Sequence, residues 1–295
     1  MPVGAMESTY TFSFLKEHDI PDLYDAFMGA FADYVVPIKL SRKEFDVKIK
    51  REGVQLSFCV GAYQGNRLVG FIMTGLGEWL GKPTAYNAGT GVLPEHRGQR
   101  LTERMYEALL PKLRESGIEQ CLLEVIRQNE AALKVYQRIG FRTTRSLECF
   151  RAPKQDLTCP DGEVDAVTVA GAPKPQWQTY AQFFDVQPSW QNTSQAFRLN
   201  PNEKLVLEAC DADKQLIGYV AFFPKTGSVA QLAVQAGYRS QGIATALLRE
   251  VVKRTEAPAL LVVNVDATCT RLLEFLRRRN FSYLLGQYEM LLPLV

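Results

Sequence analysis

An internal repeat with a period near half the chain length constrains this 295-residue chain more than any other feature. Self-similar segments that keep their order and spacing indicate two copies of one fold. We therefore predict a first domain at residues 1–152, a linker at 153–162 that holds prolines and a glycine, and a second domain at 163–295. Three pairs of segments carry the repeat, at offsets of 148, 142 and 140 residues: Asn66–Phe71 with Lys214–Tyr219, Val92–Arg97 with Val234–Arg239, and Arg138–Phe141 with Arg278–Phe281.

The composition excludes several classes of protein. A hydrophobic fraction of 46% and a charged fraction of 22% are ordinary for a globular chain, and a net charge of +2 is too small to indicate a nucleic-acid or membrane partner. Six cysteines without a CxxC pair, together with two histidines, do not fit a structural metal site or a disulfide framework. The chain has no long apolar run and no leader-like start. We expect a cytoplasmic protein without a metal ion.

Hydrophobic periodicity predicts strands and helices that alternate in both copies, hence a mixed α/β fold with helices on the faces of a mixed sheet. In the first copy we expect strands at 9–15, 57–63, 67–76, 85–92, 121–126 and 146–151, and helices at 20–31, 41–51, 101–116 and 131–139. In the second copy we expect helices at 175–184, 189–197, 243–254 and 268–279, and strands at 204–210, 215–223, 228–234, 259–265 and 288–292.

A short loop between a strand and a helix occurs at the same place in both copies. In the second copy the loop and first helical turn contain Arg239, Gly242 and Ala244. Gly242 lets backbone amides approach a ligand closely, and the free N–H groups at the helix start can bind a pyrophosphate. In the first copy the corresponding residues are Arg97, Gly98, Gln99, Arg100, Leu101 and Thr102, so that Arg100 replaces the glycine and Thr102 the small residue.

These loops resemble the [RQ]xxGx[GA] signature of the GNAT N-acetyltransferase superfamily, and a second stretch strengthens the resemblance. Residues 123–141 match the pattern LEVxxxNxxAxxxYxxxGF of GNAT enzymes. The resemblance implies two tandem GNAT folds and an acetyl-CoA-dependent N-acetyltransferase. It implies Glu124 as the base and Tyr136 as the acid of a direct attack by an amine. It also implies that Asn129 binds the pantetheine arm, and that Gly91, Val92 and, in the second copy, Val234 lie along the cofactor.

The second copy lacks these functional groups when Phe281 is aligned with Phe141. Counted from these two phenylalanines, Asn264 stands for Glu124, Leu276 for Tyr136 and Cys269 for Asn129. The sequence therefore places the acid and base in the first copy and the better loop in the second.

The sequence leaves several alternatives open. Tyr136 could be a core aromatic residue, Glu124 a partner of an arginine, and Asn129 an ordinary helix N-cap. Catalysis could occur in the second copy, or the chain could be a non-catalytic acyl-CoA-binding or regulatory protein. The acceptor is expected to be a small-molecule amine or a peptide N-terminus, and the chain a monomeric pseudo-dimer or a homodimer.

Overall fold

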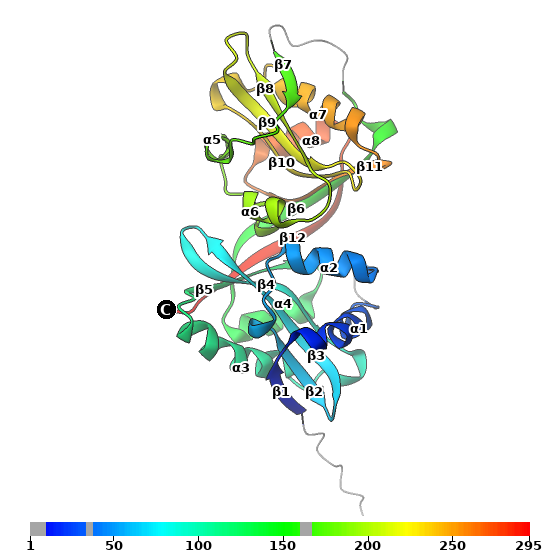
Figure 1. Cartoon of the computed structure of the whole chain (residues 1–295), viewed down its shortest axis with the longest axis vertical. Coiled ribbons are helices and arrows are strands. Elements are labelled where there is room, and N and C mark those ends of the chain that lie inside the picture. Colours follow the sequence, from blue (N-terminus) through cyan, green and yellow to red (C-terminus); the bar gives the residue numbers. More distant parts are fainter. Residues whose placement is uncertain (1–9, 34–37, 160–166) are drawn as a thin grey trace, which may run out of the picture. The chain divides into compact units, whose positions relative to one another are not determined.

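A computed structural model describes residues 10–33, 38–159 and 167–295. Internal contacts divide the chain into two compact units (Figure 1). Unit 1 contains Met1–Thr144 and Glu289–Val295, and unit 2 contains Arg145–Tyr288. These units are defined by contacts, whereas the predicted domains are defined by the repeated sequence.

Unit 1 contains a sheet with the strand order β1-β2-β3-β4-β5-β12, in which β4 and β5 are parallel. Its helices include two before the first hairpin and two after β4. The elements are β1 (Tyr10–Phe14), α1 (Ile20–Ala30), α2 (Arg42–Arg51), β2 (Val60–Gln64), β3 (Arg67–Trp79), β4 (Lys82–Val92), α3 (Leu101–Glu115), β5 (Gln120–Ile126), α4 (Glu130–Ile139) and the end of β12 (Ser282–Pro293).

Unit 2 repeats this plan in the order β6-β11-β10-β9-β8-β7. Its parallel pair is β10 and β11, the counterparts of β4 and β5. The elements are β6 (Arg142–Pro153), β7 (Thr168–Gly171), α5 (Trp177–Ala181), the 3-10 helix η5 (Trp190–Asn192), α6 (Ser194–Leu199), β8 (Leu205–Cys210), β9 (Leu216–Phe223), β10 (Ser228–Val234), α7 (Ile243–Arg254), β11 (Ala259–Asp266) and α8 (Thr270–Arg278).

The closing strand of each copy completes the sheet of the other unit. Strand β6 follows α4 of the first copy, yet its residues 147–153 pair with β11 in unit 2. The end of β12 lies beside β5 in unit 1, where the Leu294 amide donates to the Glu119 carbonyl at 2.8 Å. The predicted linker begins inside this strand, because Pro153 still belongs to β6. Residues 160–166 lie outside the described ranges.

Most predicted elements are confirmed, although α5 is shorter than predicted and β6 and β12 begin earlier, at Arg142 and Ser282. Three further points need correction. Residues 57 and 58 form a 3-10 turn, so β2 begins only at Val60. The helix predicted over 189–197 is wrong as a continuous element. It breaks at Thr193, whose hydroxyl caps α6 by accepting from the Ala196 amide at 3.2 Å. Strand β7 was not predicted, because its four residues are too short for a periodic signal.

Candidate active site

The candidate active site lies where β4 and β5 of unit 1 separate. The two strands pair in parallel register from Thr84–Gln120 to Tyr86–Leu122. Immediately afterwards, β4 carries a bulge: Asn87 faces Thr74 and Gly89 faces Met73, which leaves Ala88 unmatched on β3. A bulge bends its strand. The bend and the end of pairing together open a gap between β4 and β5.

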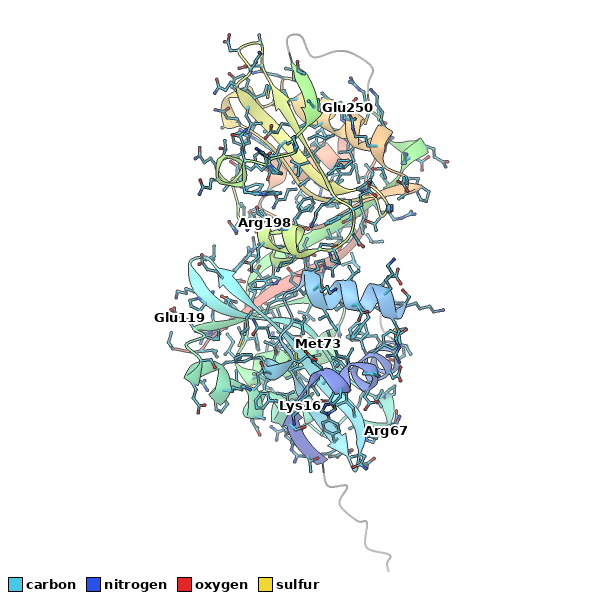
Figure 2. All side chains as sticks on the ribbon, viewed as in Figure 1. Lys16, Arg67, Met73, Glu119, Arg198 and Glu250 are labelled. Atoms are coloured by element: carbon cyan, nitrogen blue, oxygen red, sulfur yellow. The ribbon has the colours of Figure 1, made fainter. Side chains whose placement is uncertain are left out.

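The two faces of the sheet at this gap can be assigned from cross-strand pairs, because residues directly opposite each other share a face. Gly75 faces Tyr86 and Met73 (labelled in Figure 2) faces Gly89. A Cβ on Gly89 would contact Phe27 of α1 at 3.5 Å. Tyr86 therefore points to the face covered by α1 and α2, and its neighbour Asn87 points to the face covered by α3 and α4.

Tyr136, the predicted acid, lies on the α3–α4 face at the bend. Its ring makes edge contacts with Tyr106 and Phe141, at centroid distances of 6.5 and 5.7 Å. The side-chain nitrogen of Asn87 is 3.4 Å from the Tyr136 hydroxyl and 2.9 Å from the Tyr106 hydroxyl. The Tyr136 hydroxyl is thus at the opening of the strands, next to a polar group of the bent strand.

The neighbouring phenol keeps its proton at neutral pH. Burial, with a smaller effect from Tyr136, raises the pKa of Tyr106 well above its ordinary value of 10.0. Tyr106 is therefore a neutral hydrogen-bonding partner within this cluster of Asn87, Tyr106 and Tyr136, which we call the phenol cluster.

Glu124, the predicted base, lies on the opposite face. Its Oε2 accepts a hydrogen bond from the Tyr86 hydroxyl at 3.0 Å. Since Tyr86 points to the α1–α2 face, the carboxylate of Glu124 is on that face, while Tyr136 is on the other. A molecule that contacts both groups has to occupy the gap between the strands.

The two predicted phosphate-binding loops share one backbone conformation. In the first copy Gly98 and Arg100 have φ values of 78° and 54°, and in the second copy Ser240 and Gly242 have φ values of 63° and 89°. Arg100 thus adopts the left-handed conformation that favours glycine, and the loop geometry is retained. The first amides of α3, from Leu101 onward, have no carbonyl one turn earlier to bond, so the loop fits a pyrophosphate.

The arginine that begins each loop is engaged with its own unit. Arg97 donates to the carbonyls of Val92 and Ala30 and, through both terminal nitrogens, to Asp33 at 2.7 and 2.8 Å. Arg239 repeats this with Val234, Phe183 and Asp185. In both copies this side chain joins the end of the strand to the segment after the first helix, so its structural task is to hold the loop in place.

The other predicted binding residues are placed as follows. Asn129 caps α4, with its side-chain oxygen accepting from the Ala132 amide at 3.1 Å. Gly91 has a structural reason to be glycine, because a Cβ would lie 2.7 Å from Ala30 and from Phe71. Leu101 is buried under the loop, and Gln99 is exposed. Thr102 and Ala244 are half-buried in the first turns of α3 and α7.

In unit 2 the phenol cluster is replaced by apolar side chains. At an offset of 142, Val229 stands for Asn87 and Leu248 for Tyr106, and Leu276 stands for Tyr136. All three are buried in one hydrophobic cluster against α7 and α8. No phenol or carboxamide remains among them to interact with a sulfur or an acyl oxygen.

On the other face of the unit 2 sheet, neutral polar groups connect β10 with β11. Strands β10 and β11 pair at Ser228–Leu261. Beyond that pair, Gln231 of β10 donates to the Asn192 carbonyl at 2.5 Å, and the Asn192 side chain donates to the Val263 carbonyl of β11 at 2.7 Å. Asn192, in η5, therefore spans the gap between these strands.

The alignment around Glu124 also needs one adjustment. Seven positions separate Leu122 from the cap residue Asn129, and eight separate Leu261 from Cys269. The extra residue coincides with Asn264, which has a φ of 57° at an irregularity of the β11–β6 pairing. The strand register makes Val263 the counterpart of Glu124 in the second copy. Neither Val263 nor Asn264, the counterpart by sequence, carries a carboxylate.

Sequence reasoning missed Tyr86, Asn87 and Tyr106. The last two could have been found, because the repeat aligns them with Val229 and Leu248 at a constant offset. A position that is polar in one copy and apolar in the other is therefore a candidate for a functional difference between the copies.

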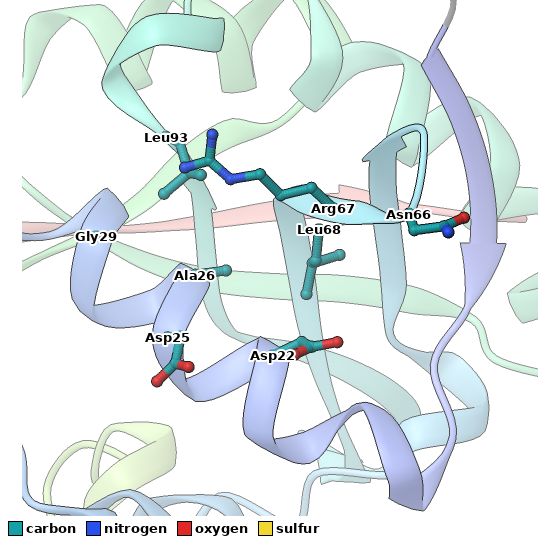
Figure 3. Close-up of a pocket in the computed structure, with 8 residues that line it drawn as sticks. All are labelled: Asp22, Asp25, Ala26, Gly29, Asn66, Arg67, Leu68 and Leu93. Atoms are coloured by element: carbon teal, nitrogen blue, oxygen red, sulfur yellow. The ribbon is translucent and has the colours of Figure 1, made fainter.

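A shallow pocket also lies between α1 and the β2–β3 hairpin of unit 1 (Figure 3). Asp22, Asp25 and Gly29 line it from the helix, and Asn66 and Arg67 from the hairpin. Neither Glu124 nor Tyr136 lines it, so it is separate from the candidate active site.

Two kinds of feature are absent from the residues that the structure describes. No helix among them is both long and apolar enough to span a lipid bilayer. No group of three or more histidine, cysteine, aspartate or glutamate side chains within them is arranged to hold a metal ion.

Comparisons with known proteins show relatives of both copies. The Acetyltransferase (GNAT) family profile matches residues 20–141 and 172–281. Mycothiol acetyltransferase of Saccharomonospora viridis is 31% identical over 116 residues, which is 36% of this chain and 38% of that protein. N-alpha-acetyltransferase 30 of Schizosaccharomyces pombe is 34% identical over 56 residues, 19% of this chain and 37% of that protein. The matched segments thus cover well under half of each curated relative.

Solved structures confirm the predicted fold. A GCN5-related N-acetyltransferase from Sphaerobacter thermophilus superposes with a TM-score of 0.74 at 18% identity, covering 97% of this chain and 96% of that one. A tandem GNAT protein from the clavulanic acid biosynthesis pathway has a TM-score of 0.74 at 12% identity and covers 97% and 99% of the two chains. Because the family profile matches most of the sequence in two successive regions, this chain belongs to the GNAT family of acetyltransferases and contains two GNAT repeats.

Proposed function

We propose that the first copy transfers an acetyl group from acetyl-CoA to a primary amine by direct attack. The observation that carries the proposal is the pair of polar groups on either side of the β4–β5 gap: Glu124 with Tyr86 on one face, and Tyr136 with Asn87 and Tyr106 on the other. The phenol cluster has only apolar counterparts in unit 2.

Each residue has one role in this proposal. The loop at Gly98–Leu101 and the start of α3 hold the pyrophosphate of the co-substrate through backbone N–H groups. Glu124 takes one proton from the acceptor ammonium, which frees the nitrogen lone pair for attack on the thioester carbonyl carbon. Tyr136 gives its proton to the sulfur as the carbon–sulfur bond breaks. It regains a proton from the nitrogen as the amide forms, so the products are the N-acetylated amine, coenzyme A and one released proton.

The state of the cysteines supports a location in the cytoplasm. All six lie in the described ranges and none forms a disulfide, and three of them are buried. A reducing compartment keeps thiols in this state.

The test compares variants of the two copies over a panel of amines. Tyr136→Phe is expected to lower kcat by about 10²- to 10⁴-fold, the usual contribution of a general acid, with acetyl-CoA binding retained. Tyr283→Phe, a phenol-to-phenyl change at an exposed site in unit 2, is the matched control and should leave kcat unchanged.

Two results would replace this proposal with its alternatives. If Gly242→Glu abolishes turnover while Tyr136→Phe does not, catalysis belongs to the second copy. If acetyl-CoA binds by calorimetry but no amine in the panel releases coenzyme A, the chain is a non-catalytic acyl-CoA-binding protein.

A further inference from the structure

A buried cluster of charges lies at the carboxyl end of α2, in Lys48, Arg51 and Glu52. The Glu52 side chain is fully buried and accepts from the Lys48 ammonium at 2.6 Å and from the Arg51 guanidinium. Two cations therefore share one carboxylate. We call these residues the α2 charge cluster.

A glycine sets the cluster on the face of the candidate base. Gly75 of β3 lies beneath the Glu52 backbone, and a Cβ there would be 2.0 Å from the Glu52 carbonyl oxygen. The adjoining Gly53 accepts from the Leu76 amide and fixes this approach. Gly75 is paired with Tyr86, which donates to Glu124. Glu52, Tyr86 and Glu124 thus follow one another across the α1–α2 face of the sheet.

Both cations of the cluster act on the candidate base. Lys48 and Arg51 have attractive electrostatic interactions with Glu124, and Arg51 also interacts with Tyr86. The Arg51 side chain is 32% exposed and that of Lys48 17%. In the part of the chain that the structure describes, Nε of Arg51 is buried without a hydrogen-bond partner. Since a guanidinium has five N–H donors and an ammonium three, the pair keeps donors for another anion.

The charge balance indicates what can bind there. Two cations against the single carboxylate of Glu52 leave one positive charge beside the place where a substrate ammonium would meet Glu124. An acceptor with several positive charges would be repelled by Lys48 and Arg51. An acceptor with one ammonium and one anionic group would place opposite charges against both Glu124 and the cluster.

We infer that the acceptor is an amine that carries a carboxylate or phosphate group, and that Arg51 and Lys48 bind this group beside Glu124. The inference rests on the proposed function. It makes Arg51 a specificity-determining residue, and it disfavours polyamines and aminoglycosides as acceptors.

The experiment measures kcat/KM with acetyl-CoA over matched acceptor pairs. The pairs are amino acids with their carboxamides, and phosphoethanolamine with ethanolamine. The anionic member of at least one pair is expected to be preferred about 10- to 100-fold, the effect of one hydrogen-bonded charge. Preference within the first pair identifies a carboxylate, and preference within the second a phosphate.

A variant series then assigns the preference to Arg51. Arg51→Gln is expected to remove most of the preference by slowing the anionic acceptor more than the neutral one, and Arg51→Lys to restore part of it. Arg42→Gln is the matched control, because Arg42 begins the same helix and pairs with Asp25 on the surface. Thermal melting of each variant checks that the fold is intact.

The outcomes separate this inference from the proposed function. Turnover of neutral amines or polyamines as fast as of their anionic analogues overturns the inference and leaves the proposed function standing. A preference that Arg51→Gln does not alter also overturns it. Absence of turnover on every amine, with acetyl-CoA bound, overturns both.

Discussion

The two copies keep one backbone but line their separated strands with different chemistry. In both, a bulge bends the fourth strand of the copy, an arginine fixes the following loop, and a helix begins at a left-handed residue. On the α3–α4 face the first copy has three polar side chains where the second has valine and two leucines. The fold thus persists without the polar groups, because backbone pairing and apolar packing stabilise it. On the proposed mechanism, a few substitutions decide whether the gap can support proton transfer.

The opposite faces differ in kind as well. The first copy places charged groups near its gap, whereas the second spans its gap with the neutral bridge from Gln231 through Asn192 to Val263. Burying charges carries a desolvation cost even when they are paired, while a satisfied amide bridge is compatible with a closed core. We interpret the first face as built for a ligand and the second as built for stability.

The largest effect on stability is expected from removing the carboxylate of the α2 charge cluster. Glu52→Gln leaves Lys48 and Arg51 without their anion, and breaking a buried ion pair costs about 3–5 kcal/mol. Urea denaturation of the full chain at pH 7 measures this. The matched control is Glu44→Gln, at the other end of α2, where the carboxylate is exposed. An equal loss in both variants would show that the cluster has no special energetic role.

The same comparison has a pH dependence of defined sign. Burial works to raise the pKa of Glu52, but Lys48 and Arg51 outweigh it and hold the pKa below the ordinary value of 4.5. A depressed pKa in the folded state adds stability above pH 4.5, and this stability is lost as the pH falls through the folded value. The stability gap between wild type and Glu52→Gln should therefore shrink below pH 4.5. A gap that widens there would contradict the assignment.

An intermediate effect is expected from opening the neutral bridge in unit 2. Asn192→Ala removes the donor to the partly buried Val263 carbonyl, and the loss of this hydrogen bond costs about 1–3 kcal/mol. Turnover by the folded variant should equal that of the wild type, because the proposed acid and base both lie in the first copy. Denaturation and steady-state rates measure the two quantities. Intact stability with lost turnover would move the acceptor site to the second copy.

The sequence predicted the parts of the site that depend on local pattern. The repeat, the loops, the helix that carries Tyr136 and the strand that carries Glu124 all follow from spacing and periodicity. The exchange of β6 and β12 could not be predicted, because an alternating strand does not specify which sheet it joins. The α2 charge cluster was also missed. Its i,i+4 pair, Lys48 and Glu52, is visible in the sequence. Its approach to Tyr86, however, depends on Gly75, which lies on β3 and pairs with Tyr86 of β4. The break at Thr193 has a similar cause, since η5 is held by Gln231 of β10.

The smallest expected effect concerns Arg100, the residue that separates the two loops most clearly by sequence. Its left-handed conformation costs a non-glycine residue about 1–2 kcal/mol, part of which the greater freedom of an unfolded glycine offsets. Arg100→Gly should therefore raise the unfolding free energy by up to about 1 kcal/mol, while affinity for acetyl-CoA falls because a positive charge near the pyrophosphate is lost. Since the Arg100 side chain is largely exposed, the loss of affinity should diminish at high salt. Calorimetry at two salt concentrations measures this, with Arg104→Gln, one turn further along α3, as the control.

If Arg100→Gly lowers stability, the left-handed backbone is not strained. If affinity is unchanged at low salt, the amides alone bind the phosphates, and the loops of the two copies would be equivalent in binding as they are in backbone shape.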